Sequence, residues 1–342
     1  MVVHRLNTDR RQPVFLLVAV NPLAGLFVRA LHNWSLARGA ELEVIELYRR
    51  PILPPNTHCR RLPFQYQSSW QYANAVVQCR RHALHLATQG QLAGVLIPHP
   101  LNLLTNCLAR FANRRNIALS LVPDGIANYY AGTTTQFRKK IMIRRALSPL
   151  LGLGAYRIGS SNIGLDSFRY DSIFALHQPG LLVPDGAEVR WLQLDAPART
   201  PKLSSGLFIG QPVPMGRLGM YQGVLAQAAR ILASEGISRM AYKPHPSETV
   251  PAVLAEKLES LGFLMETDST QAEQLTDQYS HFVSMTSSAL PNIRVLQPEA
   301  RCHAIFHDDY LVESGPNCAP ALQRYFESAG VFVHHLDRDS IS

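Results

Sequence analysis

Met240-Ala-Tyr-Lys-Pro-His-Pro-Ser-Glu248 is a short apolar run that ends on two prolines with a histidine between them. Neither Pro244 nor Pro246 has an N–H group to donate to a sheet, so the run predicts a strand that stops there. Lys243 and His245 then stand at the end of that strand, where cationic and N–H groups can hold an anion. The alternative interpretation is a rigid turn that carries a solvated histidine.

Strand and helix patterns alternate on both sides of this stretch. Strands are predicted over 13–20, 41–47, 92–97, 117–122, 206–212, 237–242, 263–266 and 281–285. Helices are predicted over 24–38, 68–89, 101–115, 221–235, 252–261, 272–279 and 289–296, and a surface connection over 49–63. Continuous apolar strands that alternate with helices are typical of doubly wound parallel sheets.

The 342 residues exceed what one ordinary core accommodates, so the sequence predicts two domains. We expect an α/β protein with two Rossmann-like domains. The N-terminal domain is expected over 1–155 and the C-terminal domain over 203–342. The Gly- and Pro-rich stretch 156–202 is expected to be the region that links them.

Cysteine usage and hydropathy indicate the compartment. The five cysteines are odd in number and form no C-x-x-C pair, which argues against a disulfide framework and a zinc site. No apolar stretch reaches the roughly 20 residues that span a bilayer, and no signal peptide is recognised near the N-terminus. The sequence therefore predicts a cytoplasmic protein.

A formal charge of +8 calls for an anionic partner. No nucleic-acid-binding signature accompanies the charge, so nucleic acid is not the predicted partner. Part of the charge is concentrated between residues 138 and 147, where basic and apolar side chains alternate; the basic ones are Arg138, Lys139, Lys140, Arg144 and Arg145. Such a segment is able to lie on the anionic inner face of a membrane, or to form a solvated helix face over the core.

Two further motifs lie at predicted strand ends. Asp124-Gly125 follows the strand 117–122, where ligands of parallel sheets bind, and the aspartate is a candidate general base or part of a simple turn. The second Pro-Asp-Gly copy, at 184–186, is interpreted as an ordinary turn. Ser287-Ser288 precedes the helix 289–296 and is able to bind a phosphate or to cap the helix.

In their order and in the domains that carry them, these motifs resemble those of bacterial GT-B sialyltransferases, nearest the lipooligosaccharide sialyltransferases of glycosyltransferase family 52 and the polysialyltransferases. The matching residues are Asp124-Gly125, His245-Pro246 and Ser287-Ser288. The resemblance covers nearly the whole chain in layout. The sequence departs from the family pattern in having Pro123 where a second acidic residue is often found, and in having a proline on each side of His245.

The resemblance implies the GT-B architecture of glycosyltransferases, in which two Rossmann-like domains face a central cleft, with the N-terminal domain binding the acceptor and the C-terminal domain binding the donor. It also implies inverting transfer of sialic acid from CMP-sialic acid to a hydroxyl group of a lipooligosaccharide or capsule-type glycan, with no metal or other cofactor. Asp124 would be the general base, and His245 would donate to the departing CMP phosphate. Glu266 would hold the ribose, with Glu273 as the fallback. The expected donor-binding residues are Gly210, Gln211, Lys243, His245, Pro246, Glu266, Ser287 and Ser288, and the expected acceptor-binding residues are Gly125 and Asn128.

Three alternatives remain open at this point. Transfer of another CMP-activated sugar, such as Kdo, pseudaminic or legionaminic acid, shares every motif. A non-catalytic nucleotide- or nucleic-acid-binding protein would use the basic surface and would not need Asp124. An epimerase of the two-Rossmann type would hold a sugar nucleotide between the same two domains.

Overall fold

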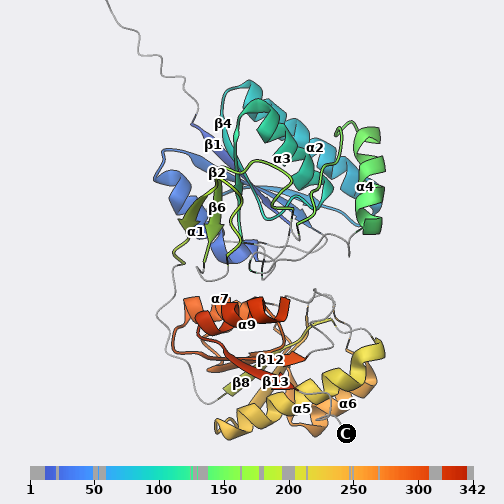
Figure 1. Ribbon diagram of the computed structural model, residues 1–342, viewed down its shortest axis with the longest axis vertical. Coiled ribbons are helices and arrows are strands. Elements are labelled where there is room, and N and C mark those ends of the chain that lie inside the picture. The colour runs from blue at the N-terminus through green and yellow to red at the C-terminus, as the bar shows by residue number, and fades with distance from the viewer. Residues whose placement is uncertain are drawn as a thin grey trace, which may run out of the picture. The chain divides into compact units, whose positions relative to one another are not determined.

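The computed structural model describes residues 12–20, 23–48, 53, 59–123, 125, 129, 138–161, 164–176, 181–194, 205–212, 215–245, 248, 250–268, 270–307 and 318–336. The chain divides into two compact units (Figure 1). Unit 1 comprises Met1–Asp124, Thr133–Ala175 and Val183–Gln193. Unit 2 comprises Gly125–Gly132, Leu176–Leu182 and Leu194–Ser342.

Unit 1 is built on a sheet whose described strands are all parallel and lie in the order β3-β2-β1-β4-β5-β6-β7. The strands are β1 (Val14–Ala19), β2 (Glu41–Tyr48), β3 (Arg60–Gln65), β4 (Leu92–Ile97), β5 (Ala118–Leu121), β6 (Ser172–Ala175) and β7 (Glu188–Trp191). The central strands are almost wholly buried, as expected for a parallel sheet covered on both faces.

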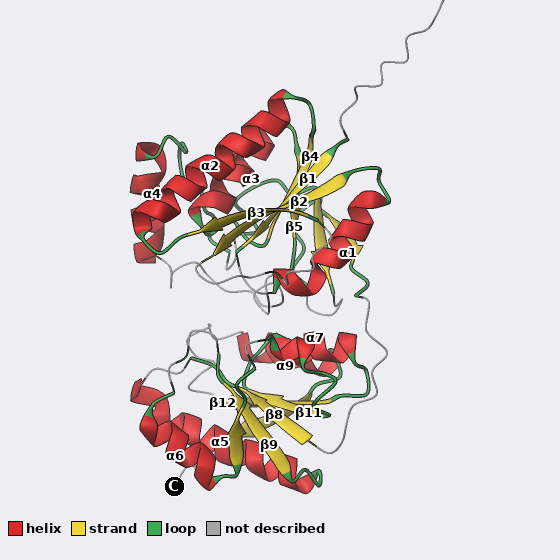
Figure 2. Ribbon diagram, turned by 180° about the vertical axis from the view of Figure 1, so that it is seen from behind, coloured by secondary structure: helices red, strands yellow, loops and turns green. Residues whose placement is uncertain are grey.

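The helices of unit 1 are α1 (Ala24–Leu36), α2 (Ser69–Thr88), α3 (Leu103–Arg115) and α4 (Arg138–Leu150). Helix α1 covers one face of the sheet, and α2 and α3 cover the other (Figure 2). The Ser68 hydroxyl accepts from the Gln71 N–H at the start of α2, and the Gln71 side chain accepts from the Ser68 N–H. This capping box fixes where the helix begins.

Unit 2 is built on a second parallel sheet, with its described strands in the order β10-β9-β8-β11-β12-β13. The strands are β8 (Ser205–Ile209), β9 (Arg239–Lys243), β10 (Phe263–Met265), β11 (His281–Ser284), β12 (Arg301–His307) and β13 (Phe332–Leu336). The helices are η2 (Met215–Arg217), α5 (Leu218–Ser234), α6 (Ala252–Ser260), η3 (Ala272–Gln274), α7 (Ala289–Leu296) and α9 (Cys318–Ser328).

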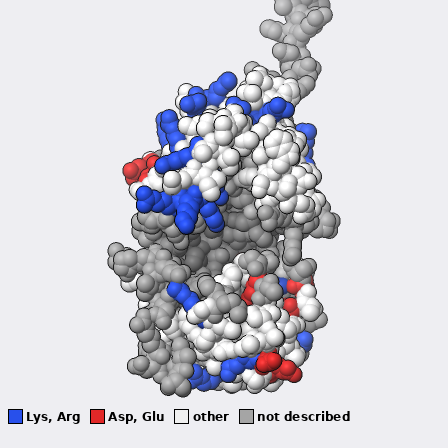
Figure 3. All heavy atoms as spheres, turned by 90° about the vertical axis from the view of Figure 1, so that its right-hand side faces the viewer, with Lys and Arg blue, Asp and Glu red and all other residues white. Residues whose placement is uncertain are grey.

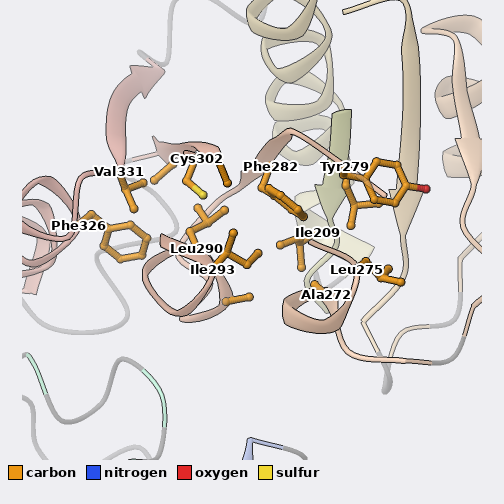
Figure 4. Close-up of a cluster of buried hydrophobic side chains, with 14 of the residues drawn as sticks. Ile209, Ala272, Leu275, Tyr279, Phe282, Leu290, Ile293, Cys302, Phe326 and Val331 are labelled. Atoms are coloured by element: carbon orange, nitrogen blue, oxygen red, sulfur yellow. The ribbon is translucent and has the colours of Figure 1, made fainter. Parts of the chain in front are cut away.

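Two apolar clusters fill the two faces of this second sheet. On one face, α5 and α6 pack against Phe208 and Phe263. On the other face, Leu290 and Ile293 of α7 point toward Phe282, and the same cluster extends to α9 (Figure 4). Apolar side chains thus occupy both faces of the sheet. The polar residues described below lie at the ends of its strands.

Part of the fold differs from the sequence prediction. The described end of the predicted connection 49–63 begins β3, an edge strand that tolerates Pro63. Six residues of β3 pair with β2, and two ion pairs add to this contact: Arg60 reaches the buried Glu43 at 2.7 Å and Arg61 reaches the buried Glu46 at 2.5 Å. Apolar periodicity does not reveal a strand with so many charged and exposed side chains.

Two further segments also differ from the prediction. The stretch 156–202, expected to be a linker region, contributes β6 and β7 to the first sheet, and these strands have only four residues each. The helix predicted over 272–279 is a short 3-10 turn, η3, followed by turns. Thr276 and Asp277, which follow η3, have low helix propensity. The final strands β12 and β13 and the helix α9 had not been predicted at all.

Candidate functional site

The carboxyl ends of the central strands of unit 2 gather most of the described residues expected to bind the donor. The strand order reverses between β8 and β11, and ligands of open α/β sheets bind beside such a reversal. The Ser284 hydroxyl at the end of β11 donates to the Ile209 carbonyl at the end of β8, at 2.7 Å. Gly210 follows β8 and Ser287 follows β11, so both residues lie beside this point.

Gly210 is required by its surroundings. Its N–H donates to the Lys243 carbonyl at 2.8 Å, which joins the ends of β8 and β9. A Cβ atom on Gly210 would lie 2.6 Å from the Tyr242 hydroxyl and 2.7 Å from Glu248 Oε2. A side chain therefore does not fit here. The next residue, Gln211, donates its N–H to the Tyr221 hydroxyl at 3.2 Å.

Glu248 holds the turn that contains His245. The His245 N–H donates to Glu248 Oε2 at 2.9 Å, and the Glu248 N–H donates to the His245 carbonyl at 2.8 Å. Glu248 Oε1 accepts from the Tyr242 hydroxyl at 2.6 Å, and the Tyr221 hydroxyl lies 3.0 Å from that of Tyr242. No role for Glu248 was predicted from the sequence. The signal for it is an acid three residues after His245, the spacing of a capping box.

His245 is exposed, but its ring is partly enclosed. The loss of hydration lowers the pKa of His245 below its ordinary value, while the Glu248 carboxylate acts in the opposite direction. The imidazole is therefore neutral at neutral pH and still has one ring N–H to donate. A bound phosphate would favour the protonated form.

Lys243 and Glu266 lie at the ends of neighbouring strands β9 and β10. Lys243 is buried, and its Nζ donates to the Asp268 carbonyl at 2.5 Å. Glu266 Oε1 accepts from the Asp268 N–H at 2.9 Å, and Glu266 Oε2 accepts from the Tyr279 hydroxyl. Burial opposes the charged form, but these hydrogen bonds and Lys243 lower the pKa of Glu266. Glu266 is thus an ionised, half-buried carboxylate.

Glu273, the fallback for the ribose, has a different environment. Its side chain is buried in η3, and Oε1 accepts from Asn292 Nδ2 at 3.2 Å. Burial raises the pKa of Glu273 above its ordinary value. An enclosed carboxyl group that favours its neutral form is suited to packing rather than to holding two ribose hydroxyls.

The serine pair is only partly used for helix capping. Ser287 Oγ accepts from the Ala289 N–H at 3.3 Å. Ser288 is the N-cap residue of α7, but its side chain makes no capping hydrogen bond, and in this respect the capping interpretation is wrong. Gly125 lies beside it, because a Cβ atom on Gly125 would come 3.2 Å from Ser288 Oγ.

Gly125 belongs to unit 2, as does Tyr129, whose ring stacks on Tyr325 with centroids 3.9 Å apart. Asp124, Asn128 and Pro246 lie outside the described residues. The second Pro-Asp-Gly copy is a turn, as predicted: the Ala187 N–H donates to the Pro184 carbonyl at 3.1 Å, and Gly186 has a φ of +75°.

Helix α4 presents apolar side chains outward. Ile141 and Ser148 are buried, whereas Met142, Ile143 and Leu150 are 62%, 58% and 81% exposed. Lys and Arg side chains gather on the side of unit 1 where α4 lies (Figure 3). The outward face of the helix is therefore not the uniformly polar face of an ordinary surface helix.

Within the described residues, no three or more His, Cys, Asp or Glu side chains are grouped so that they could hold a metal ion. The same residues include no helix that is both long and apolar enough to cross a membrane.

No family model matches the chain, and no curated protein matches it in sequence. The chain is similar in structure to the glycotransferase of kitacinnamycin, with a TM-score of 0.51, 13% identity and coverage of 96% of this chain and 87% of that one. It is also similar to an α/β-galactoside α-2,3-sialyltransferase from Photobacterium phosphoreum, with a TM-score of 0.49, 12% identity and coverage of 94% and 97%. The glycosyltransferase SnogD from Streptomyces nogalater gives a TM-score of 0.48 at 9% identity, with coverage of 96% and 90%.

These structural neighbours are glycosyltransferases. The likeness to the kitacinnamycin glycotransferase, together with the two parallel sheets, confirms the predicted fold class of two Rossmann-like α/β domains of the GT-B kind.

Proposed function

We propose that this protein is an inverting, metal-independent glycosyltransferase that moves sialic acid from CMP-sialic acid to a hydroxyl group of a lipooligosaccharide or capsule-type glycan. Asp124 takes the proton of the acceptor hydroxyl, and the acceptor oxygen bonds to the anomeric carbon of the donor sugar. The bond from that carbon to the phosphate oxygen breaks, and CMP leaves with the electron pair. A single displacement of this kind inverts the anomeric centre.

The observation that carries the proposal is the approach of Gly125 to Ser288 within unit 2. These residues belong to two of the three motifs that resemble the sialyltransferases, and they are far apart in the sequence. The third motif contributes His245, which follows β9 of the same sheet. In the proposed reaction, Ser287, Ser288 and His245 donate hydrogen bonds to the phosphate of the departing CMP. Preorganised donors at a developing charge can each contribute on the order of 3 kcal/mol.

Glu266 supports recognition of the ribose. A carboxylate has about four lone-pair sites, and the hydrogen bonds that Glu266 accepts from Asp268 and Tyr279 use only part of that capacity. Its lowered pKa keeps it ionised at neutral pH, so it is an acceptor for the two ribose hydroxyls. Lys243 strengthens this arrangement, because its ammonium group holds the Asp268 carbonyl of the same loop.

Transfer by paired aspartate variants tests the chemical step. Asp124→Asn keeps the size of the side chain but removes the base, so transfer should fall by roughly a hundredfold or more, with little change in CMP affinity. Asp185→Asn is the matched control from the second Pro-Asp-Gly copy, and it should leave transfer nearly intact. Equal losses in the two variants, or full activity in Asp124→Asn, would contradict the assignment of the base.

The donor sugar is tested separately. Purified protein is given CMP-sialic acid, CMP-Kdo, CMP-pseudaminic acid or CMP-legionaminic acid, and the release of CMP is followed. Fastest release from CMP-sialic acid supports the donor named above, while preference for another donor keeps the mechanism and changes the substrate. Binding of a nucleotide without turnover of any donor favours a non-catalytic binding protein.

We also propose that α4 holds the protein at an anionic membrane, where lipid-linked glycans are found. Supporting this, the helix exposes Met142, Ile143 and Leu150 beside basic side chains. Apolar side chains insert at the interface, and Lys and Arg side chains attract anionic lipids by about 1 kcal/mol each. Arg144 has a further role inside the unit, since its Nη1 donates to the Leu101 carbonyl at 2.5 Å.

A further inference from the structure

A polar pocket of about 370 Å³ lies in unit 1. Four arginines line it, namely Arg110, Arg114, Arg157 and Arg169. Its size falls within the range of about 300–1,000 Å³ that is usual for small-molecule sites. Helix α3 runs from the carboxyl end of β4 to the amino end of β5, so its last turn lies at the amino edge of the sheet. The pocket is therefore remote from the carboxyl edge of that sheet.

Arg110 is fixed at the pocket by packing. It is only 7% exposed, and its Nη1 donates to the Ala155 carbonyl at 2.6 Å. A Cβ atom on residue 154 would lie 2.3 Å from the guanidinium group, so Gly154 makes room for it. Burial lowers the pKa of Arg110, and the charges of Arg114 and Arg157 lower it further. The site thus contains positive charges that repel one another.

One acid, Asp166, lines this pocket against four arginines, and its oxygens are hydrogen-bonded to serines. Asp166 accepts hydrogen bonds from the N–H and hydroxyl groups of Ser160 at 2.7 and 3.0 Å, and from those of Ser161 at 3.2 and 2.6 Å. Burial opposes its charged form, but these four bonds outweigh burial and hold the pKa of Asp166 at about 2. Among the described residues, no carboxylate forms an ion pair with Arg114, Arg157 or Arg169.

We propose that this pocket binds a phosphate group. Several guanidinium groups around one concave site match a phosphate, which offers three oxygens and up to two negative charges. A ligand with a single carboxylate group carries only one negative charge, so it would offset less of the repulsion among the four arginines than a phosphate group does. The phosphate comes either from a free oxyanion or from a phosphorylated sugar, such as one carried by a glycan acceptor. The proposal goes beyond donor binding in unit 2 and does not depend on it.

Isothermal titration of the full chain at about 150 mM salt tests the pocket, with inorganic pyrophosphate, glucose 6-phosphate and glucose as probes. The variant Arg114→Gln combined with Arg157→Gln removes two exposed guanidinium groups and should weaken binding of the phosphates at least tenfold. Arg115→Gln is the matched control, because this exposed neighbour of Arg114 does not line the pocket. It should bind as the unchanged protein does.

The variant His245→Ala distinguishes phosphate binding at the donor site from phosphate binding at the pocket. Phosphate binding that persists in this variant and is lost in the double arginine variant belongs to the pocket, whether or not the donor proposal holds. Tighter binding of glucose 6-phosphate than of pyrophosphate identifies a sugar phosphate, and the reverse identifies a free oxyanion. No saturable binding in the unchanged protein, equal binding in the double variant, or an equal loss in Arg115→Gln would overturn the proposal.

Discussion

Gly125 lies so close to Ser288 that a methyl group on its Cα would come 3.2 Å from the serine hydroxyl. Gly125 also has a φ of +81°, in the region that favours glycine. A turn at this position would require the positive φ, and a phosphate site would require the open space beside the Cα atom. Glycine at position 125 meets both requirements. This contact joins the Asp-Gly motif to the serine motif.

Gly125→Ala should therefore affect more than backbone conformation. The positive φ is expected to cost about 1 kcal/mol of unfolding free energy in Gly125→Ala and in Gly186→Ala, since both glycines are left-handed. Only Gly125→Ala also presses on Ser288, because nothing lies within 4 Å of a Cβ atom on Gly186. CMP affinity, measured by titration, should fall roughly tenfold in Gly125→Ala alone. Equal affinities in the two variants would remove Ser288 from the phosphate site.

CMP binding should strengthen as the pH falls from about 8 to about 6. Burial lowers the pKa of His245 in the free protein, and a bound phosphate raises it, so binding takes up a proton. A group whose pKa is higher in the complex than in the free protein favours the complex at low pH. Titration of CMP in buffers of different pH measures this slope. The variant His245→Gln is the control for the titration of the phosphate itself, and in this variant CMP affinity should no longer increase as the pH falls. An unchanged slope in His245→Gln would contradict the role of His245.

Glu266→Gln should reduce the preference for CMP over 2′-deoxy-CMP. The ionised Glu266 is the proposed acceptor for the ribose hydroxyls, and a hydrogen bond to a charged group contributes about 1.5–3 kcal/mol. Competition between the two nucleotides gives the ratio of affinities. Glu273→Gln is the control, because burial favours the neutral form of Glu273 and Gln resembles that form. Loss of the preference in Glu273→Gln alone would move the ribose site to Glu273.

Glu248→Ala should lower both stability and CMP affinity. It removes the acceptor for the His245 N–H and for the buried Tyr242 hydroxyl, and an unsatisfied buried group costs about 1–3 kcal/mol. Glu256→Ala, at an exposed position on α6, should change neither property. Denaturant unfolding and CMP titration make the comparison. Normal CMP binding by a destabilised Glu248→Ala would show that Glu248 stabilises the fold without positioning His245.

Binding to vesicles of anionic lipid should depend on both parts of α4. Replacing Met142, Ile143 and Leu150 by Ser removes the exposed apolar area, and replacing Lys139, Lys140 and Arg145 by Glu reverses the charge. Arg144 is left unchanged because it donates to the Leu101 carbonyl. Either set should greatly reduce sedimentation with the vesicles and should spare transfer to a soluble acceptor. Unchanged sedimentation in both variants would contradict membrane binding.

The sequence predicts most of the two sheets because their central strands are continuous apolar runs. Strand β3 escaped prediction because it is a charged edge strand that contains Pro63, and β6 and β7 because they lie in a Gly- and Pro-rich stretch, which is typical of turns. The site residues that directly follow a strand could be predicted, because ligands of parallel sheets bind at the carboxyl ends of the strands. The partners Tyr221 and Tyr279 could not, because their contacts with Gln211 and Glu266 depend on how the segments between these residues pack.

Thermal unfolding with CMP, UMP and GDP tests the central claim, that unit 2 binds a CMP-activated donor, most directly. A ligand that binds only the folded state raises the free energy of unfolding by about 2.7 kcal/mol at a hundredfold excess over its dissociation constant. We predict that CMP stabilises the unchanged protein, that UMP and GDP stabilise it much less, and that the CMP effect is lost in His245→Ala. Equal stabilisation by all three nucleotides, or by none, would contradict a CMP-activated donor.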